Sequence, residues 1–286
     1  MTEPVIFQIG KYNVTKPSTT ARRFSLFLWG DSGSGKTTLA ATAPRPILWV
    51  NFDPDGTSSI ASMADDILEL DLAREDPSVV EKFRETNLNP MDLSGFIEEH
   101  EIKTVVFDSV TFFANLATNQ GVTKGRNLTI ERPGQMGYQF RNSFTNQAMN
   151  NLNRLTGRLG VNLIIIAHED VPILDDNGHI VSISILIGGK MPKTSPVQVS
   201  EVWNLSDTGT ERRIAVRPCR RRVPMKTRMF LTSKGPEFVW KFDADKPLDH
   251  PGNVPYLLST WHEDWNKAGA KIPLPGVRAA KKEKDK

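Results

Sequence analysis

The chain has 286 residues, of which 38% are hydrophobic and 24% are charged, and its net charge is only +3. These values are typical of a globular protein with a real core and exclude a polycation. No apolar run approaches the roughly 20 residues of a membrane span, and the first residues lack the basic-then-apolar order of a signal peptide. The single cysteine, Cys219, excludes an internal disulfide and fits a reducing compartment. We therefore expect no membrane partner and a cytoplasmic location.

The first predicted strand leads into a glycine-rich loop. Residues 24–29, FSLFLW, form an apolar run that predicts a buried strand of a parallel sheet, and a short helix that Pro44 ends follows the loop. The loop GDSGSGKTT has the spacing G-x-x-x-x-G-K-[ST], in which backbone N–H groups, the lysine and the positive end of the next helix face the phosphates of a nucleotide. The residues expected to bind the nucleotide are Gly30, Asp31, Ser32, Gly33, Ser34, Gly35, Lys36, Thr37 and Thr38.

Acidic residues follow the next two predicted strands. Residues 47–52 end in the turn-like sequence DPDG, and residues 104–107 are closed by Asp108. Asp108 is expected to organise Mg²⁺ together with the Thr37 hydroxyl, although an Asp at this position can also cap the following helix. Either Asp53 or Asp55 is a candidate to orient the attacking water, because parallel strands end at one edge of the sheet; the alternative is an ordinary turn.

The middle of the chain alternates between helices and one further strand. We expect a polar helical region over residues 76–100, a helix over 110–118, a glycine-containing loop, and a long helix over 138–159 whose apolar residues recur at spacings of three and four. Residues 161–167 predict a fourth buried strand, which ends at His168. His168 is a candidate to hydrogen-bond the γ-phosphate, or a strand cap satisfied by local backbone.

From about residue 170 the pattern changes to short β-like runs separated by turns, at residues 179–187, 201–205, 212–216, 227–231 and 237–242. The sequence predicts an α/β fold with a mainly parallel central sheet flanked by helices, plus antiparallel β additions in the C-terminal third. The predicted parts are a leader over 1–23, an ATPase domain over 24–267 with its β-rich part from 170, and a basic, disordered tail over 268–286.

Residues 212–228 hold seven arginines and one lysine without an acid, which indicates a polyanionic partner, a phosphate at a subunit interface, or only a solvated strand face.

Several nucleotide-binding classes lack their signatures here. No N-K-x-D motif follows the fourth strand, as in a GTPase, and no L-S-G-G-Q motif is present, as in a transporter ATPase. The chain resembles the RecA superfamily, and most of all its small phage-encoded ATPases of single-strand annealing and recombination. The resemblance rests on four motifs in this order: GDSGSGKTT, DPD, VVFDS and IIIAHED.

This resemblance implies ATP and Mg²⁺ as ligands and catalytic roles for Lys36, Asp53 or Asp55, Asp108 and His168; RecA has Glu where this chain has Asp. It also implies that Lys226 and Arg228, in MKTR, contact the γ-phosphate of a neighbouring subunit, so that the protein works as a ring or filament. Two loops, residues 121–137 and 171–195, would contact single-stranded DNA. The DNA-binding candidates are Lys124, Arg126, Arg132, Lys190 and Lys193 in these loops, with Arg220, Arg221 and Arg222 of the basic run.

The sequence thus predicts an oligomeric, single-stranded-DNA-binding ATPase of phage recombination, annealing or repair, located in the host cytoplasm. Two alternatives stay open at this point. One is a nucleotide-gated assembly or adaptor protein with little turnover, and the other is the ATPase subunit of a helicase or DNA-packaging motor.

Overall fold

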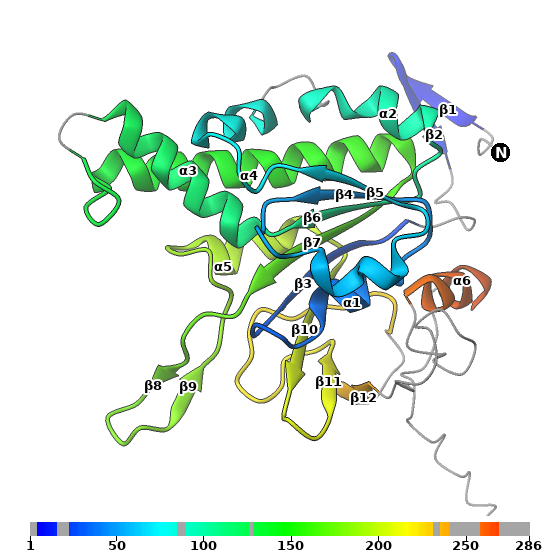
Figure 1. Cartoon of the computed structure of the whole chain (residues 1–286). Helices are drawn as coiled ribbons and strands as arrows, with labels where there is room; N and C mark the ends of the chain where they lie inside the picture. Colours follow the sequence, from blue (N-terminus) through cyan, green and yellow to red (C-terminus); the bar gives the residue numbers. More distant parts are fainter. Residues whose placement is uncertain are drawn as a thin grey trace, which may run out of the picture.

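The computed structural model describes residues 5–15, 23–84, 90–125, 128–230, 235–240 and 258–268. Its centre is an eight-stranded sheet with the order β12-β11-β10-β3-β7-β6-β4-β5 (Figure 1). The strands are β3 (Ser25–Gly30), β4 (Ile47–Asn51), β5 (Ile67–Asp71), β6 (Thr104–Asp108), β7 (Asn162–His168), β10 (Glu201–Asp207), β11 (Arg212–Ala215) and β12 (Glu237–Trp240). From β10 to β5 every neighbouring pair is parallel, while β11 and β12 continue the β10 edge in antiparallel pairing. The predicted fold class is confirmed.

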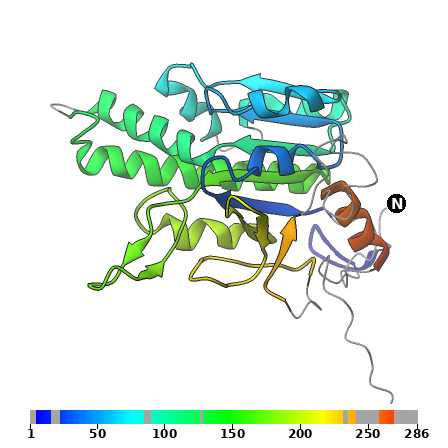
Figure 2. The same ribbon diagram turned by 60° about the horizontal axis from the view of Figure 1, so that its bottom comes forward.

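Helices cover both faces of the sheet (Figures 1 and 2). One face packs against α2 (Leu93–Glu99), α3 (Val110–Lys124) and α4 (Gly134–Leu159), and the other against α1 (Lys36–Ala40) and α6 (Leu258–Ala268). The shorter helices are η1 (Ser58–Met63), η2 (Pro77–Phe83), η3 (Pro90–Asp92), α5 (Met191–Thr194) and η4 (Ser195–Gln198). Both faces are covered, so the central strands are mainly apolar, and all residues of β3, β4 and β6 are buried.

The register of the parallel strands brings their carboxyl ends together. Gly30, the last residue of β3, lies opposite His168 of β7, and Asp108 of β6 lies opposite Asn51 of β4. The predicted phosphate loop, the DPDG turn, Asp108 and His168 therefore meet at one edge of the sheet, as expected for a parallel α/β fold.

Two small hairpins lie outside the main sheet. The first pairs β1 (Val5–Ile9) with β2 (Tyr12–Thr15), within the region predicted as a leader. The second pairs β8 (Ile173–Leu174) with β9 (Ile180–Ser182) and extends away from the sheet (Figure 1); we call residues 170–187 the arm. The predicted tail beyond residue 268 lies outside the described residues.

Several local predictions were wrong. β10 was expected to be an antiparallel addition but pairs in parallel with β3, and residues 228–230 form a turn instead of a strand. β5 was not predicted, whereas the described part of the region over 76–100 is helical as expected and contains η2, η3 and α2. The loop expected over 121–137 is shorter than predicted, because α3 continues to Lys124 and α4 begins at Gly134.

Candidate nucleotide-binding site

The carboxyl edge of the sheet encloses a cavity of about 500 Å³. Six of the predicted nucleotide-binding residues line it: Ser32, Gly33, Gly35, Lys36, Thr37 and Thr38. The predicted catalytic residues Asp53, Asp55, Asp108 and His168 also line it, as do Gly56, Ser59, Phe112, Ile166 and Arg212. Gly30, Asp31 and Ser34 belong to the same loop without lining the cavity. The structure therefore brings together residues that are more than 130 positions apart in the chain.

The glycines of the loop have different physical roles. Gly33 and Gly35 have φ values of +74° and +95°, which L side chains rarely adopt, and these conformations turn the backbone around the cavity. A Cβ at Gly30 would lie 1.9 Å from the carbonyl oxygen of Leu205 in β10. Gly30 is thus required by the close approach of two strands, whereas Gly33 and Gly35 are required by the shape of the loop.

Lys36 is folded back into its own loop. Its Nζ donates hydrogen bonds to the carbonyl oxygens of Gly30 (3.1 Å) and Asp31 (2.6 Å). Burial lowers the pKa of Lys36, and the nearby carboxylates, Asp108 first, act in the opposite direction. A buried ammonium that is held by carbonyls is suited to exchange these partners for phosphate oxygens, which carry full charges.

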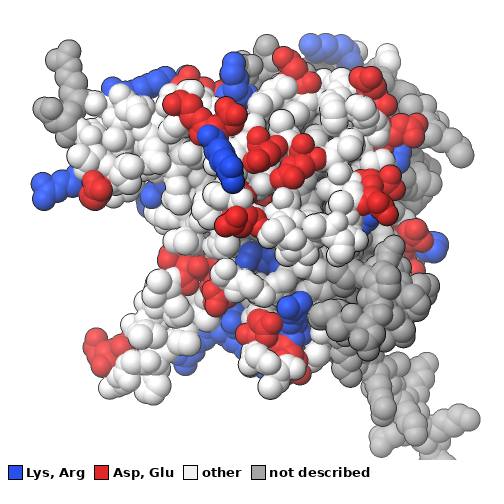
Figure 3. All heavy atoms as spheres, in the orientation of Figure 1, with Lys and Arg blue, Asp and Glu red and all other residues white. Residues whose placement is uncertain are grey.

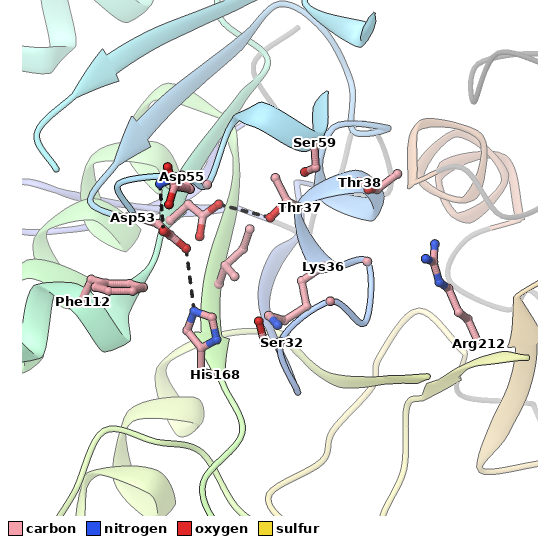
Figure 4. A pocket seen from close by; sticks show the side chains of 15 residues that line it. Ser32, Lys36, Thr37, Thr38, Asp53, Asp55, Ser59, Phe112, His168 and Arg212 are labelled. Carbon is pink, nitrogen blue, oxygen red and sulfur yellow. Dashed lines mark hydrogen bonds and ion pairs between the residues drawn. The ribbon is translucent and has the colours of Figure 1, made fainter. Parts of the chain in front are cut away.

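Asp108 and Thr37 form the candidate magnesium site. The Thr37 hydroxyl donates to Oδ2 of Asp108 at 3.5 Å (Figure 4), and Asp108 is almost fully buried. Burial and the nearby Asp53 carboxylate raise the pKa of Asp108 to about 7. A buried carboxylate with such a high proton affinity favours a cation beside it, and its oxygen and the threonine hydroxyl are ligand types that Mg²⁺ accepts. The residues present fit Mg²⁺.

The structure distinguishes the two acids of the DPDG turn. The Asn51 side chain accepts the Asp53 backbone N–H at 2.9 Å, and Oδ1 of Asp53 accepts the Asp55 N–H at 3.2 Å. Oδ2 of Asp53 lies 4.0 Å from Nε2 of His168, whereas Asp55 is exposed at the outer side of the turn (Figure 4). Both acids line the cavity, but Asp53 is the one whose position is fixed by the turn and whose carboxylate faces His168.

His168 is held from three sides. Its backbone N–H donates to the Thr111 hydroxyl at 3.0 Å, its ring meets Phe112 edge-on at 5.6 Å between centroids, and Asp53 lies opposite. Burial first, and the neighbouring Lys36 charge second, lower the pKa of His168. The lowered pKa favours the neutral imidazole, which carries one ring N–H.

Arg212 was not predicted as a site residue, although it belongs to the basic run. It lines the cavity on the far side of Lys36 and Thr38 from Asp53 and His168 (Figure 4). Only the antiparallel return of β11 beside β10 places it there, so a local motif could not have identified it.

Lys226 and Arg228 lie outside this cavity. The Lys226 Nζ donates to the backbone carbonyls of Pro196 (3.3 Å), Val197 (3.4 Å) and Val199. Arg228 is exposed, and its backbone N–H donates to Oε1 of the buried Glu201 at 2.7 Å. The pair contributes nothing to its own subunit's cavity, and the contact with a neighbouring subunit stays a prediction.

The basic run is not a continuous positive surface, because acids from outside the run pair with it. Arg212 pairs with Asp207, Arg213 with Glu211 and Glu237, Arg220 with Glu237, and Arg222 approaches Glu169 at 3.7 Å. Arg221 and Arg228 are exposed and make no ion pair with a described residue. The sequence reading of the run as one stripe therefore overstates its charge.

The candidates for DNA binding in the two loops have different environments. Lys124 pairs with Glu81 and lies 5.9 Å from the centroid of the Phe140 ring, while Arg132, Lys190 and Lys193 are exposed. Arg126 lies outside the described residues. No helix in the described part of the chain has the length and apolar character needed to cross a membrane.

Comparison with known proteins gives one family. A family model described as an AAA domain matches residues 22–239. The search of curated proteins finds no match. Among solved structures, the chain is similar to a KaiC-like protein from the hyperthermophilic archaeon Pyrococcus horikoshii OT3, with 16% identity, 73% of this chain and 84% of that chain covered, and a TM-score of 0.39. It is also similar to the RadB recombinase, with 13% identity, 71% and 84% covered, and a TM-score of 0.40.

Proposed function

Since this chain belongs to the AAA domain family and carries an intact phosphate loop, we propose that it is a Mg²⁺-dependent ATPase that assembles into an oligomer and acts on single-stranded DNA. The RecA-like order of motifs supports a role in recombination, annealing or repair of phage DNA. The observation that carries the proposal is that one cavity is lined by the side chains of five predicted site residues: Lys36, Thr37, Asp53, Asp108 and His168.

Five residues of the cavity have a proposed chemical role in phosphoryl transfer to water. Lys36 leaves the carbonyls of Gly30 and Asp31 and binds the terminal phosphates, while Asp53 accepts a proton from the attacking water or orients it. His168, neutral and 4.0 Å from Asp53, donates to a γ-phosphate oxygen. Thr37 and Asp108 would hold Mg²⁺, which neutralises charge on the phosphates when bound.

A neighbouring subunit is proposed to complete this site. The cavity has acids and Lys36 at its catalytic end, and Arg212 on the other side. Arg228 is exposed, and Glu201 fixes the backbone that presents it. A cation supplied by a neighbouring subunit stabilises the negative charge of the transition state only after the subunits assemble. In other phosphoryl-transfer enzymes such a cation raises the turnover rate strongly.

We use the name α3–α4 tip for residues 128–133, which precede α4. The surface between the arm and the α3–α4 tip is the proposed path of DNA. Arg132 lies at the tip, Lys190 and Lys193 lie at α5, and the space-filling view is hollowed between the tip and the arm (Figure 3). The arm itself has no lysine or arginine and carries Asp170, Asp175 and Asp176. The DNA contacts are therefore assigned to Arg132, Lys190 and Lys193 and not to the arm, and binding is expected to weaken as salt increases.

The basic test is ATP turnover by the purified protein with and without single-stranded or duplex DNA, at two salt concentrations. Stimulation by single strands that salt reduces is expected. Nucleotide binding without turnover would support the adaptor alternative, stimulation by duplex alone would support a motor subunit, and no effect of any nucleic acid would refute the DNA-based proposal.

Mixing two inactive variants tests the contact between subunits. Lys36→Ala should abolish nucleotide binding, and Arg228→Ala should retain binding but lose turnover. Mixed together, they should regain part of the activity, because Lys36→Ala subunits offer Arg228 to the intact cavity of Arg228→Ala subunits. Lys103→Ala, which alters an exposed lysine before β6, is the control and should turn over ATP normally. Normal turnover by Arg228→Ala alone would refute the trans contact.

A further inference from the structure

A second cavity of about 480 Å³ adjoins the first one. It lies beside the turn between β10 and β11, and Asp207, Thr210 and Trp240 line it. Arg212 lines both cavities, so its side chain marks the passage from one to the other. None of the roles assigned above uses this second space.

Arg212 and Trp240 form a stacked pair at that passage. They face each other across β11 and β12, and the Arg212 guanidinium carbon lies 5.6 Å from the centroid of the Trp240 ring. The Arg212 Nε–H donates to Oδ2 of Asp207 at 3.1 Å, which fixes the plane of the guanidinium. Such a pair presents a flat, polarisable surface on which a planar aromatic ligand can stack.

The stacked pair rests directly against the phosphate loop. A Cβ at Gly35 would lie 3.0 Å from Cζ3 of Trp240 and 3.2 Å from a terminal nitrogen of Arg212. The backbone at Gly35 therefore needs a glycine for two reasons, its φ of +95° and the closeness of this pair. A part of a bound ligand that extends beyond the phosphate loop on this side would therefore contact Arg212.

The positions of the catalytic groups fix the direction of a bound nucleotide. Asp53 and His168 lie at one end of the first cavity, and Arg212 lies beyond Lys36 and Thr38 at the other (Figure 4). When the terminal phosphate faces Asp53 and His168, the first phosphate lies toward Thr38. The nucleoside then extends toward Arg212 and the second cavity.

We propose that the second cavity binds the nucleoside end of the nucleotide, with the base stacked on the Arg212 guanidinium and Trp240 supporting it from behind. Asp207 and Thr210 lie at the edge of this cavity and offer the polar atoms that distinguish one base from another. This inference rests on the proposed function, because it assigns the second half of the same ligand. Under this proposal the antiparallel strands β11 and β12 form part of the nucleotide site, because they carry Arg212 and Trp240.

The test compares two ligands that share phosphates and differ in the nucleoside. Calorimetric titration would measure ATP and inorganic tripolyphosphate binding to the whole chain as wild type, Arg212→Ala and Arg213→Ala. Arg213 is the matched control: it is the next residue of β11 and pairs with Glu211 and Glu237 instead of lining either cavity. Trp240→Phe, which keeps an aromatic ring, is a second variant that preserves the core.

Arg212→Ala should weaken ATP binding about tenfold, equivalent to about 1.4 kcal/mol, and leave tripolyphosphate binding unchanged. Trp240→Phe should weaken ATP binding by a smaller factor, and Arg213→Ala should match wild type. An equal loss for both ligands would make Arg212 a phosphate contact and overturn the proposal, as would unchanged ATP binding. If wild type bound neither ligand, the proposed function would fail as well; if it bound both and Arg212→Ala had no effect, only this inference would fail.

Discussion

Replacing Gly30 by alanine tests whether the first glycine of the loop is required by packing. The added Cβ would lie 1.9 Å from the carbonyl oxygen and 3.0 Å from the carbonyl carbon of Leu205, both of which are backbone atoms that no rotamer change can move. β3 and β10 must then separate at the pair formed by Gly30 and Leu205. Overpacking of this kind costs about 1–3 kcal/mol, and lost strand pairing adds to it, so we expect unfolding free energy to fall by about 3 kcal/mol.

Urea denaturation followed by tryptophan fluorescence measures this loss, since Trp29 and Trp203 are buried in the two strands concerned. The control is Gly95→Ala in α2, where nothing lies within 4 Å of the added Cβ. An exposed helical glycine replaced by alanine gains about 0.5–1 kcal/mol. If Gly30→Ala unfolded at the wild-type urea concentration, the argument from the β3–β10 contact would be refuted.

Two further predictions concern carboxyl groups. Asp53→Asn should lower ATP turnover at least about a hundredfold, the lower range for loss of a general base. Asp55→Asn, which alters the exposed carboxylate of the same turn, should change steady-state turnover little; equal losses would contradict the assignment. Burial raises the pKa of Glu201 above its ordinary 4.5. The folded state therefore holds this proton more tightly than the unfolded state does, and stability falls as the pH rises from about 4.5 through the folded pKa. Melting curves across that range should show wild type losing stability relative to Glu201→Gln, and parallel curves would contradict it.

The central strands and the first cavity were predictable from the sequence because their signals are local. Residues 24–29, 47–52, 104–107 and 161–167 are apolar runs bounded by polar residues, and parallel strands of this kind are buried on both faces. Their carboxyl ends must share one edge, so the convergence of Asp53, Asp108 and His168 followed from the strand assignments alone. Which of Asp53 and Asp55 faces His168 depends on how the Asn51 side chain holds the turn, which no sequence pattern reveals.

The C-terminal third was less predictable because its contacts are long-range. β10 pairs in parallel with β3 although about 170 residues separate them, and nothing in EVWNL indicates that direction. Residues 227–231 have the composition of a strand, yet the backbone of residues 228–230 turns, because Glu201 accepts the N–H groups of Arg228 and Met229. β5 was missed because Glu69 and Asp71 interrupt its apolar residues, as an edge strand allows.

Strand β10 links two parts of the molecule that would otherwise be independent. Glu201 at its beginning holds the turn that carries Arg228, and Leu205 near its end lies against Gly30 at the base of the phosphate loop. Because side chains alternate along a strand, inserting one residue between these points while Leu205 stays opposite Gly30 would turn the Glu201 side chain to the other face of the sheet, away from the turn that it holds. Evolution can lengthen or shorten the arm without this penalty. Relatives of this protein are therefore expected to vary in length at the arm and to keep the spacing from Glu201 to Leu205 fixed.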